Sequence, residues 1–370
     1  MSSRREFLKN IACASAGAFL PGGAFTQAAE AQSQAASNGQ RRQVMVGGQR
    51  VKTVDFHCHV TVPEAADVLK GTSLEKRGGG GQMLLTPERV ERMNRDGVDM
   101  QVVSINPYWY SAERDLASRL IDFQNQKLST MCAVYPDRFA ALASVAMQFP
   151  DLAAQQLEDA VKHIGLHGAA IGGSVEGEEL STPKFDPFWA KAEELQAVIF
   201  MHPQDSVAAT GVANRVHYTG YDGAVLSMNV IGNPLETALF ISHLIFDGTL
   251  DRFPNLKICC AHGGGFLTAY PDRMDHGCLV FPQQCKTQPK KRPSEYLKQL
   301  YFDSLVFTPE AVRHLVAVCG AGQIVMGTDN PIPWVTDSPV DLILATPGLS
   351  NAEQSAMLGG NARKLLGISG

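Results

Sequence analysis

The sequence has no excess of basic residues, the first feature expected of a protein that binds nucleic acid. Lys and Arg number 32 against 37 Asp and Glu, so the formal net charge is −5. A nucleic-acid-binding domain usually carries a basic face or stripe, and we expect no such partner. Charged residues make up only 19% and hydrophobic residues 45% of the 370 positions. This balance excludes disorder of the whole chain and allows a sizeable core.

Several sequence motifs with a known chemistry are also missing. Neither Gly-x-Gly-x-x-Gly nor the P-loop pattern occurs, which argues against a nucleotide-binding open sheet. The Gly-x-Ser-x-Gly motif of serine esterases is absent as well. The 8 cysteines include no Cys-x-x-Cys pair, so a cysteine-rich zinc site is not expected. Without Cys13 in the amino-terminal segment the count is odd, which predicts at least one free thiol in a largely reduced set.

The first 31 residues have the three regions of an export signal. Arg4 and Arg5 begin a basic region, a weakly apolar stretch follows at 11–20, and residues 29–31 read Ala-Glu-Ala. Paired arginines before Phe-Leu-Lys are typical of the twin-arginine signal, and a chance pair in a disordered tail is the alternative. The apolar stretch is too short for a permanent membrane anchor. We therefore expect a signal peptide over 1–31, delivery by the twin-arginine export machinery, and a periplasmic protein.

The rest of the chain is predicted to be a linker followed by one catalytic domain over 51–370. Residues 32–50 are rich in Gln, Ser, Asn and Gly, as linkers are. From residue 51 onward, short apolar runs with little polar alternation are separated by amphipathic stretches, a pattern typical of buried parallel strands between helices. Eight such units predict an α/β fold of the (β/α)8 TIM-barrel type, with an open doubly wound sheet as the alternative. The strands are expected at 53–59, 98–105, 139–148, 168–174, 197–202, 256–262, 300–306 and 324–329.

The most specific local signal is the segment Val-Asp-Phe-His-Cys-His at 54–59. Residues i and i+2 of a strand point to the same side, so His57 and His59 present two imidazoles to one spot. In a barrel, the active site lies at the carboxyl ends of the strands. Two neutral imidazoles form half of a site for zinc or another divalent ion.

Three further polar residues each close a predicted strand and precede a loop breaker. His202 is followed by proline, His262 by three glycines, and Asp329 by Asn-Pro. Any one of them alone is more simply explained as a satisfied core or capping residue. Their convergence with the His-x-His pair at one barrel mouth predicts a metal site.

This ordered set of motifs resembles the amidohydrolase superfamily, and more narrowly its aminocarboxymuconate-semialdehyde decarboxylase branch. His-x-His, His-Pro, Ala-His-Gly-Gly-Gly and Gly-Thr-Asp follow one another within residues 52–368. The resemblance implies His262 as the acid/base residue at a bound Zn²⁺, Mn²⁺ or similar divalent ion. It also implies that Arg273 reaches the substrate carboxylate in a neighbouring subunit, and hence a homodimer. The metal ligands implied by the resemblance are His57, His59, His202 and Asp329.

By the same resemblance, the expected activity is metal-dependent non-oxidative decarboxylation of a small unsaturated or aromatic carboxylic acid. A hydrolase of a lactone, amide or ester is the first alternative, because the same ligands serve both reactions. An exported binding protein without catalysis is the second. Gln204 stands where the branch has a tryptophan, so we expect a different substrate contact there. Trp109 and Trp334 follow strands and predict an aromatic substrate pocket, with ordinary packing at the rim as the alternative.

Overall fold

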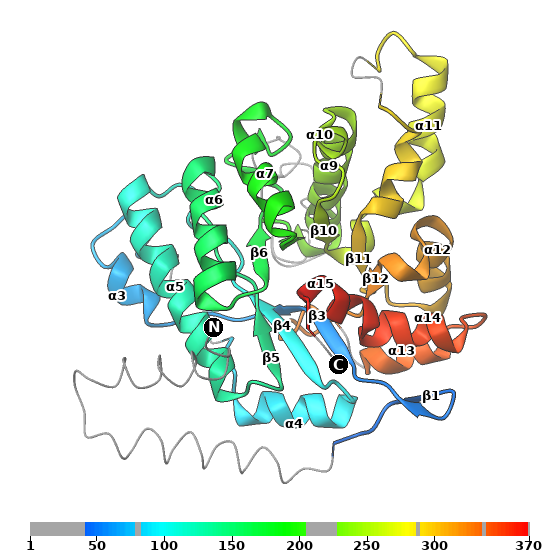
Figure 1. Cartoon of the computed structure of the whole chain (residues 1–370), viewed down its shortest axis with the longest axis horizontal. Helices are drawn as coiled ribbons and strands as arrows, with labels where there is room; N and C mark the ends of the chain where they lie inside the picture. The colour runs from blue at the N-terminus through cyan, green and yellow to red at the C-terminus, as the bar shows by residue number, and fades with distance from the viewer. Residues whose placement is uncertain (1–40, 78–82, 205–227, 286–288, 335–337, 369–370) are drawn as a thin grey trace, which may run out of the picture.

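The structure, a computed structural model, has parallel strands at its centre (Figure 1), and the pairing within the described residues includes eight of them. It describes residues 41–77, 83–204, 228–285, 289–334 and 338–368. Three strands follow one another in the order β3-β4-β5, and five in the order β6-β9-β10-β11-β12. Their bounds are β3 Val54–His59, β4 Met100–Ser104, β5 Phe139–Ala141, β6 Gly168–Ile171, β9 Val198–Met201, β10 Lys257–Cys260, β11 Tyr301–Asp303 and β12 Ile324–Val325. All eight lie within the ranges predicted from the apolar runs.

Backbone pairing closes these strands into a ring. At one junction Ala143, just after β5, pairs in parallel with Ala169 of β6. At the other junction the N–H of Phe56 on β3 donates to the carbonyl of Met326, over 2.8 Å between N and O. Each strand therefore has a neighbour on both sides, and the predicted (β/α)8 barrel is confirmed.

The strands are buried on both faces, as continuous apolar runs predict. Every residue of β9 is buried, and alternate residues belong to different clusters. Val198 and Phe200 pack inside the ring with Phe56, whose ring centroid lies 5.8 Å from that of Phe200 in an edge-to-face contact. Ile199 and Met201 belong to the outer cluster beneath the helices. The interior of the barrel is thus a packed core, and only its mouth is free for chemistry.

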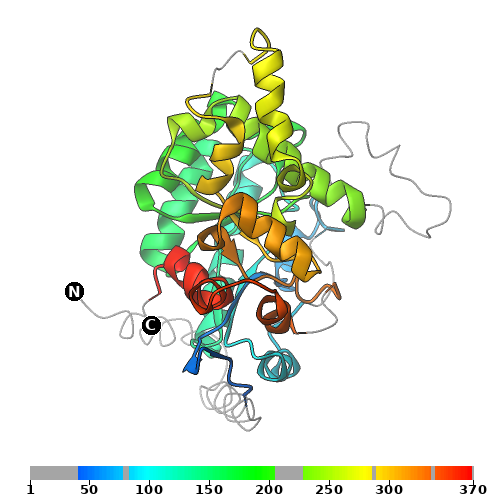
Figure 2. The same ribbon diagram turned by 90° about the vertical axis from the view of Figure 1, so that its right-hand side faces the viewer.

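Helices surround the ring, as Figures 1 and 2 show. Thr86 caps α4 by accepting a hydrogen bond from the N–H of Arg89, and Thr308 caps α12 in the same way, each followed by a proline. No helix within the described ranges combines the length and apolar character needed to cross a membrane. The bounds are α3 Ala65–Leu69, α4 Pro87–Asp96, α5 Arg114–Val134, α6 Pro150–Asp159, α7 Asp186–Leu195, α9 Asn233–Phe246, α10 Thr249–Arg252, α11 Pro271–Val280, α12 Pro309–Cys319, α13 Pro339–Ala345, α14 Asn351–Ser355 and α15 Asn361–Leu366.

Residues 41–50 belong to the folded body, which corrects the predicted linker over 32–50. They form an antiparallel hairpin of β1 (Met45–Val46) and β2 (Gln49–Arg50), and the flanking Val44 is buried in the outer core. The two glycines between the strands have positive φ, which suits a tight hairpin turn. The turn was not predicted, because the polar, glycine-rich composition of this segment resembles that of a linker. The predicted signal peptide and the rest of the linker lie outside the described residues.

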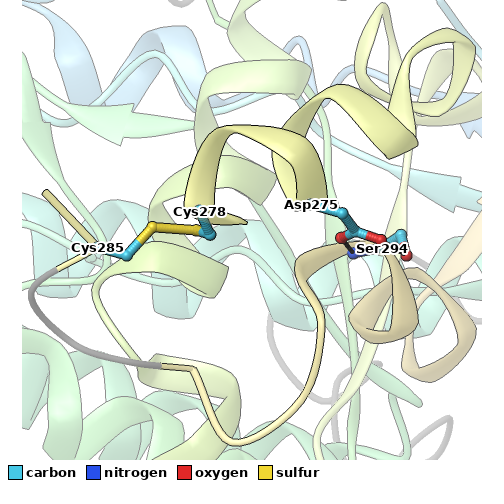
Figure 3. Close-up of a disulfide and its surroundings, with 4 residues drawn as sticks. All are labelled: Asp275, Cys278, Cys285 and Ser294. Carbon is cyan, nitrogen blue, oxygen red and sulfur yellow. Dashed lines mark hydrogen bonds between the residues drawn. A yellow bond between two sulfur atoms is a disulfide. The ribbon is translucent and has the colours of Figure 1, made fainter. Parts of the chain in front are cut away.

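One helix stands away from the barrel. None of the residues of α11 is buried, and the helix projects from the body in both views (Figures 1 and 2). A disulfide joins Cys278 on α11 to Cys285 beyond its end, and Ser294 hydrogen-bonds to Asp275 at the other end of the excursion (Figure 3). This pair was not predicted from the sequence. The other five described cysteines are free thiols, which agrees with a largely reduced set.

Candidate metal centre

Five side chains converge at the carboxyl ends of the strands, as the sequence predicted. We call His57, His59, His202, His262 and Asp329 the five-residue cluster. The Nε2 atoms of His57 and His59 lie 3.2 Å apart, and Asp329 Oδ1 lies 3.3 and 2.7 Å from them respectively. The Nε2 of His202 lies 3.9 Å from the same oxygen, and the Nε2 of His262 lies 4.0 Å from Oδ2 of Asp329.

A register shift within β3 aims both histidines of the first motif into the mouth. The pairing of β3 with β4 is irregular between Asp55 and Cys58. Phe56 packs inside the ring, whereas Cys58 packs in the outer cluster. His57 and His59 therefore take the inward positions at the end of the strand. Such irregularities commonly re-aim side chains next to active sites.

Two members of the cluster hold a backbone conformation that side-chain-bearing residues rarely adopt. His262 has a φ of 57° and Asp329 a φ of 63°. Strain of this kind is concentrated at functional sites, where the surrounding structure holds it in place. The glycine run after His262 supports the turn, because a Cβ on Gly265 would lie 2.1 Å from the carbonyl oxygen of Pro234.

The side chain of His262 is more exposed than those of the other four members of the cluster. The side chain of His57 is fully buried, and those of His59, His202 and Asp329 are at most 6% exposed. The side chain of His262 is 13% exposed. It is therefore the member of the cluster that a molecule entering the mouth reaches most easily.

The electrostatics keep the carboxylate ionised and two of the imidazoles neutral. Burial acts to raise the pKa of Asp329, but His57 and the hydrogen bonds from the histidines hold it far below its usual range. Burial lowers the pKa of His59 and lowers that of His202 well below its usual value. Burial also acts to lower the pKa of His57, but Asp329 and Asp303 raise it to about 10.

The donor atoms of the cluster fit a divalent cation. The Nδ1 atoms of His57 and His202 are engaged by Asp303 and by the carbonyl of Pro203, which leaves their Nε2 atoms facing the cluster. Nε2 of His202 is buried and has no hydrogen-bond partner among the described residues. Ligand atoms of His57, His202, His262 and Asp329 lie within 4.8 Å of one another. Imidazole nitrogens with one carboxylate oxygen suit Zn²⁺ or Mn²⁺.

Two buried carboxylates that support the cluster were not predicted from the sequence. Asp303 ends β11, and its Oδ2 lies 2.6 Å from Nδ1 of His57. Glu236 on α9 accepts hydrogen bonds from the backbone N–H groups of Gly173 and Gln204. A signal existed for Asp303, because it closes an apolar strand as Asp329 does. Glu236 lies within a helix and has no such signal.

The structure places the four predicted substrate-binding residues in different surroundings. Gln204 follows the His202-Pro203 pair and is half-buried. Trp334 is also half-buried, with its ring centroid 6.0 Å from that of Phe307. Trp109, by contrast, is fully buried and its indole N–H donates to the carbonyl of Val145. The predicted pocket-lining role of Trp109 does not agree with this position, because its ring packs in the outer core.

Arg273 lies on α11 and is exposed. Among the described residues, no hydrogen bond or ion pair joins its side chain to the five-residue cluster. The single chain therefore does not bring this predicted substrate-binding residue together with the other site residues.

Comparison with known proteins agrees with this site and fold. The model of the amidohydrolase family matches residues 54–368, and the chain belongs to that family. It is 33% identical over 282 residues to 2-amino-3-carboxymuconate-6-semialdehyde decarboxylase of Dictyostelium discoideum, covering 76% of each chain. Gamma-resorcylate decarboxylase of Polaromonas sp. is 26% identical, with 76% of this chain and 87% of that protein covered.

Solved structures have the same fold. The 5-carboxyvanillate decarboxylase of Sphingomonas paucimobilis superimposes with a TM-score of 0.74 at 22% identity, covering 86% of this chain and 100% of the other. A 2,6-dihydroxybenzoate decarboxylase bound to 2,6-dihydroxybenzoate gives a TM-score of 0.72 at 23% identity, with the same coverage.

Proposed function

We propose that the protein is a metal-dependent non-oxidative decarboxylase of a small aromatic or unsaturated carboxylic acid. The observation that carries the proposal is the convergence of four histidines and Asp329 at the mouth of the barrel. The relatives support the proposed reaction, because those matched over three quarters of the chain are named decarboxylases.

In this proposal, the buried members of the cluster are the metal ligands. Their nitrogen and oxygen atoms point to a common centre, and burial keeps water from competing for them. A Zn²⁺ or Mn²⁺ ion held there would supply Lewis-acid chemistry toward an oxygen of the substrate. The proposed ligands are His57, His59, His202 and Asp329.

His262 is the proposed acid/base residue. Its imidazole is the most exposed of the cluster, and its Nε2 faces Oδ2 of Asp329 at 4.0 Å, so a proton carried there lies next to a carboxylate. Decarboxylation breaks the bond between a substrate carbon and its carboxylate, and carbon dioxide leaves without the bonding electron pair. That pair remains on the substrate carbon, which takes up one proton. His262 moves this proton.

The substrate side of the proposed site is less charged than that of a dicarboxylate enzyme. Gln204 offers an uncharged amide close to the metal ligand His202. The half-buried ring of Trp334, five positions after Asp329 in the chain, lies against the exposed ring of Phe307. Such a rim favours a flat, largely apolar acid with one carboxylate over a molecule with several carboxylates.

The proposal includes a homodimer in which Arg273 serves the site of the second copy. Its support is that α11 buries none of its own residues while it carries Arg273. The end of the helix is apolar, with Leu279 74% and Phe281 58% exposed. An apolar patch on a projecting helix is a feature of protein–protein interfaces. A guanidinium delivered by a partner helix would bind the substrate carboxylate through two parallel hydrogen bonds.

We further propose that the chain is exported to the periplasm through the twin-arginine route. The support is the order of the basic, apolar and small-residue regions over 1–31. Export of folded chains by this route is compatible with a metal loaded before transport.

Carbon dioxide release tests the proposed reaction. Metal-loaded protein is incubated with a panel of hydroxybenzoates and unsaturated dicarboxylates and, separately, with lactones, amides and esters. Release of one carbon dioxide per product from an acid, absent in His262→Ala, supports the proposal. Turnover of only the lactones, amides or esters, with net addition of water, would replace it with a hydrolase. No turnover of any compound by protein with a full complement of metal would contradict the proposal.

A further inference from the structure

A single buried carboxylate connects the candidate metal ligands to the candidate acid/base residue. Oδ2 of Asp303 lies 2.6 Å from Nδ1 of His57 and accepts the backbone N–H of His262 at 2.8 Å. Its Oδ1 accepts the N–H groups of Gly263 at 2.9 Å and Leu305 at 3.0 Å. The side chain is fully buried, so these four donors have no competition from water.

The bonds to His262 and Gly263 hold a turn that is unfavourable on its own. Both residues have positive φ, 57° and 60°, and an L side chain rarely adopts that conformation. Their two successive N–H groups point at the carboxylate of Asp303 and form charge-assisted hydrogen bonds to it. These bonds offset the strain at His262. They also fix where its imidazole enters the barrel mouth.

The bond to His57 fixes which nitrogen of that ring can bind a metal. Metal ligation requires a neutral ring. A neutral imidazole that donates Nδ1–H to a carboxylate carries its lone pair on Nε2. In this structure Nε2 of His57 faces Asp329 Oδ1 at 3.3 Å. The carboxylate therefore orients the ring and selects the tautomer needed for ligation.

We infer that Asp303 is a positioning residue. Through one carboxylate oxygen it orients the ring of the metal ligand His57 and holds the backbone of the acid/base residue His262. This inference rests on the proposed metal site. It goes beyond that site by assigning a common support to two residues with different roles. In this role Asp303 acts only through His57 and His262.

Asp303→Asn is the most informative variant, because the amide side chain has the same shape as the carboxylate that it replaces. Its oxygen can keep the bonds to Gly263 and Leu305, whereas its NH₂ group replaces Oδ2. That group can accept neither Nδ1–H of His57 nor the N–H of His262. The matched control is Asp99→Asn at the opposite end of the barrel. Asp99 is also a buried carboxylate that accepts a backbone N–H, that of Thr53 at 2.9 Å.

The first measurement is Zn²⁺ affinity of the metal-free full-length proteins, by competition with a chromogenic chelator. We expect Asp303→Asn to bind Zn²⁺ roughly 10–100-fold more weakly than the wild type, the usual effect of losing an outer-shell partner. Asp99→Asn should bind Zn²⁺ as the wild type does. At saturating metal, Asp303→Asn should still show a lower kcat with little change in KM, because His262 is displaced. Wild-type Zn²⁺ affinity in a folded Asp303→Asn protein overturns the inference.

A second measurement needs no variant, in case Asp303→Asn does not fold. Nitrogen-15 NMR of the histidine rings in Zn²⁺-loaded wild type should show His57 protonated at Nδ1. Protonation at Nε2 overturns the inference. Neither Zn²⁺ affinity nor the tautomer depends on the reaction catalysed. Loss of Zn²⁺ affinity without carbon dioxide release from any acid would therefore sink the decarboxylase proposal and leave this inference standing.

Discussion

Oε2 of Glu236 accepts a hydrogen bond from the backbone N–H of Gln204, with 2.9 Å between the two atoms. The other oxygen of the same carboxylate accepts the N–H of Gly173 at 3.0 Å. Gln204 comes two residues after the candidate ligand His202, and Gly173 comes just after β6. One helix residue thus ties together the loops that follow two barrel strands.

We expect Glu236→Gln to destabilise the protein by about 1–3 kcal/mol, because the amide nitrogen leaves one of these buried N–H groups without an acceptor. Denaturant unfolding measures the change. Glu193→Gln is the matched control, since Glu193 also accepts a backbone N–H, that of Asn255 at 2.7 Å, in a more exposed setting. Equal stability losses in the two variants would mean that burial of Glu236 does not matter.

Purified protein should contain about one divalent ion per chain, because three imidazoles and one carboxylate form a set with an open position. His57→Ala should lose most of this metal, whereas His163→Ala, which changes an exposed histidine, should keep it. Elemental analysis with and without prior chelation gives the result. Activity that survives complete metal removal would contradict the proposed centre.

His262→Ala should lower kcat by roughly 10²–10⁴, the usual contribution of a positioned acid/base group. Its metal content should stay near that of the wild type, because the other four cluster members are the proposed ligands. Steady-state kinetics and elemental analysis on the same preparation separate the two effects. If His262→Ala is as metal-poor as His57→Ala, then His262 is a ligand and the role assigned to it is wrong.

Arg4→Lys combined with Arg5→Lys should leave the protein in the cytoplasm, because paired arginines are the feature that the export receptor reads. Arg41→Lys combined with Arg42→Lys is the control, since it changes a second pair of arginines that lies outside the predicted signal. Cell fractionation followed by immunodetection locates each protein. Normal periplasmic delivery of the double variant would exclude the twin-arginine route.

Arg273→Ala should lower kcat/KM strongly and leave the metal content unchanged, because a guanidinium that binds a carboxylate with two hydrogen bonds has no substitute in alanine. Arg119→Ala, which removes an exposed arginine on α5, is the control. If Arg273 acts across a dimer interface, mixing inactive Arg273→Ala and His262→Ala chains should restore activity. One site of the mixed dimer then carries both changes and the other carries neither.

No recovery in verified mixed dimers would show that Arg273 does not serve the partner's site. Analytical ultracentrifugation provides a separate check of the assembly. Replacing the exposed Leu279 and Phe281 with serine should convert the dimer to a monomer if the end of α11 lies in the interface. A dimer that survives both changes would place the interface elsewhere.

The sequence predicted the barrel and the five-residue cluster because both follow from local patterns. Strands buried on both faces read as apolar runs, and a polar residue that closes such a run stands out against them. The hairpin at 41–50 escaped prediction because its glycine-rich turn resembles a linker. The core position of Trp109 depends on contacts with residues far along the chain, such as Val145. The register shift in β3 has no local signal either, since alternation alone also places His57 and His59 on one side.

The ring junction between β3 and the end of β12 has a consequence for the order of assembly. His57 and Asp329 are 272 positions apart in the chain, and the N–H of Asp329 donates to the carbonyl of His57 across that junction. The first and last parts of the barrel must meet before these two side chains can share one ion. A chain that ends before its eighth strand cannot make the complete set of ligands. Stable metal binding would then indicate that the whole chain has been synthesised and that the barrel has closed.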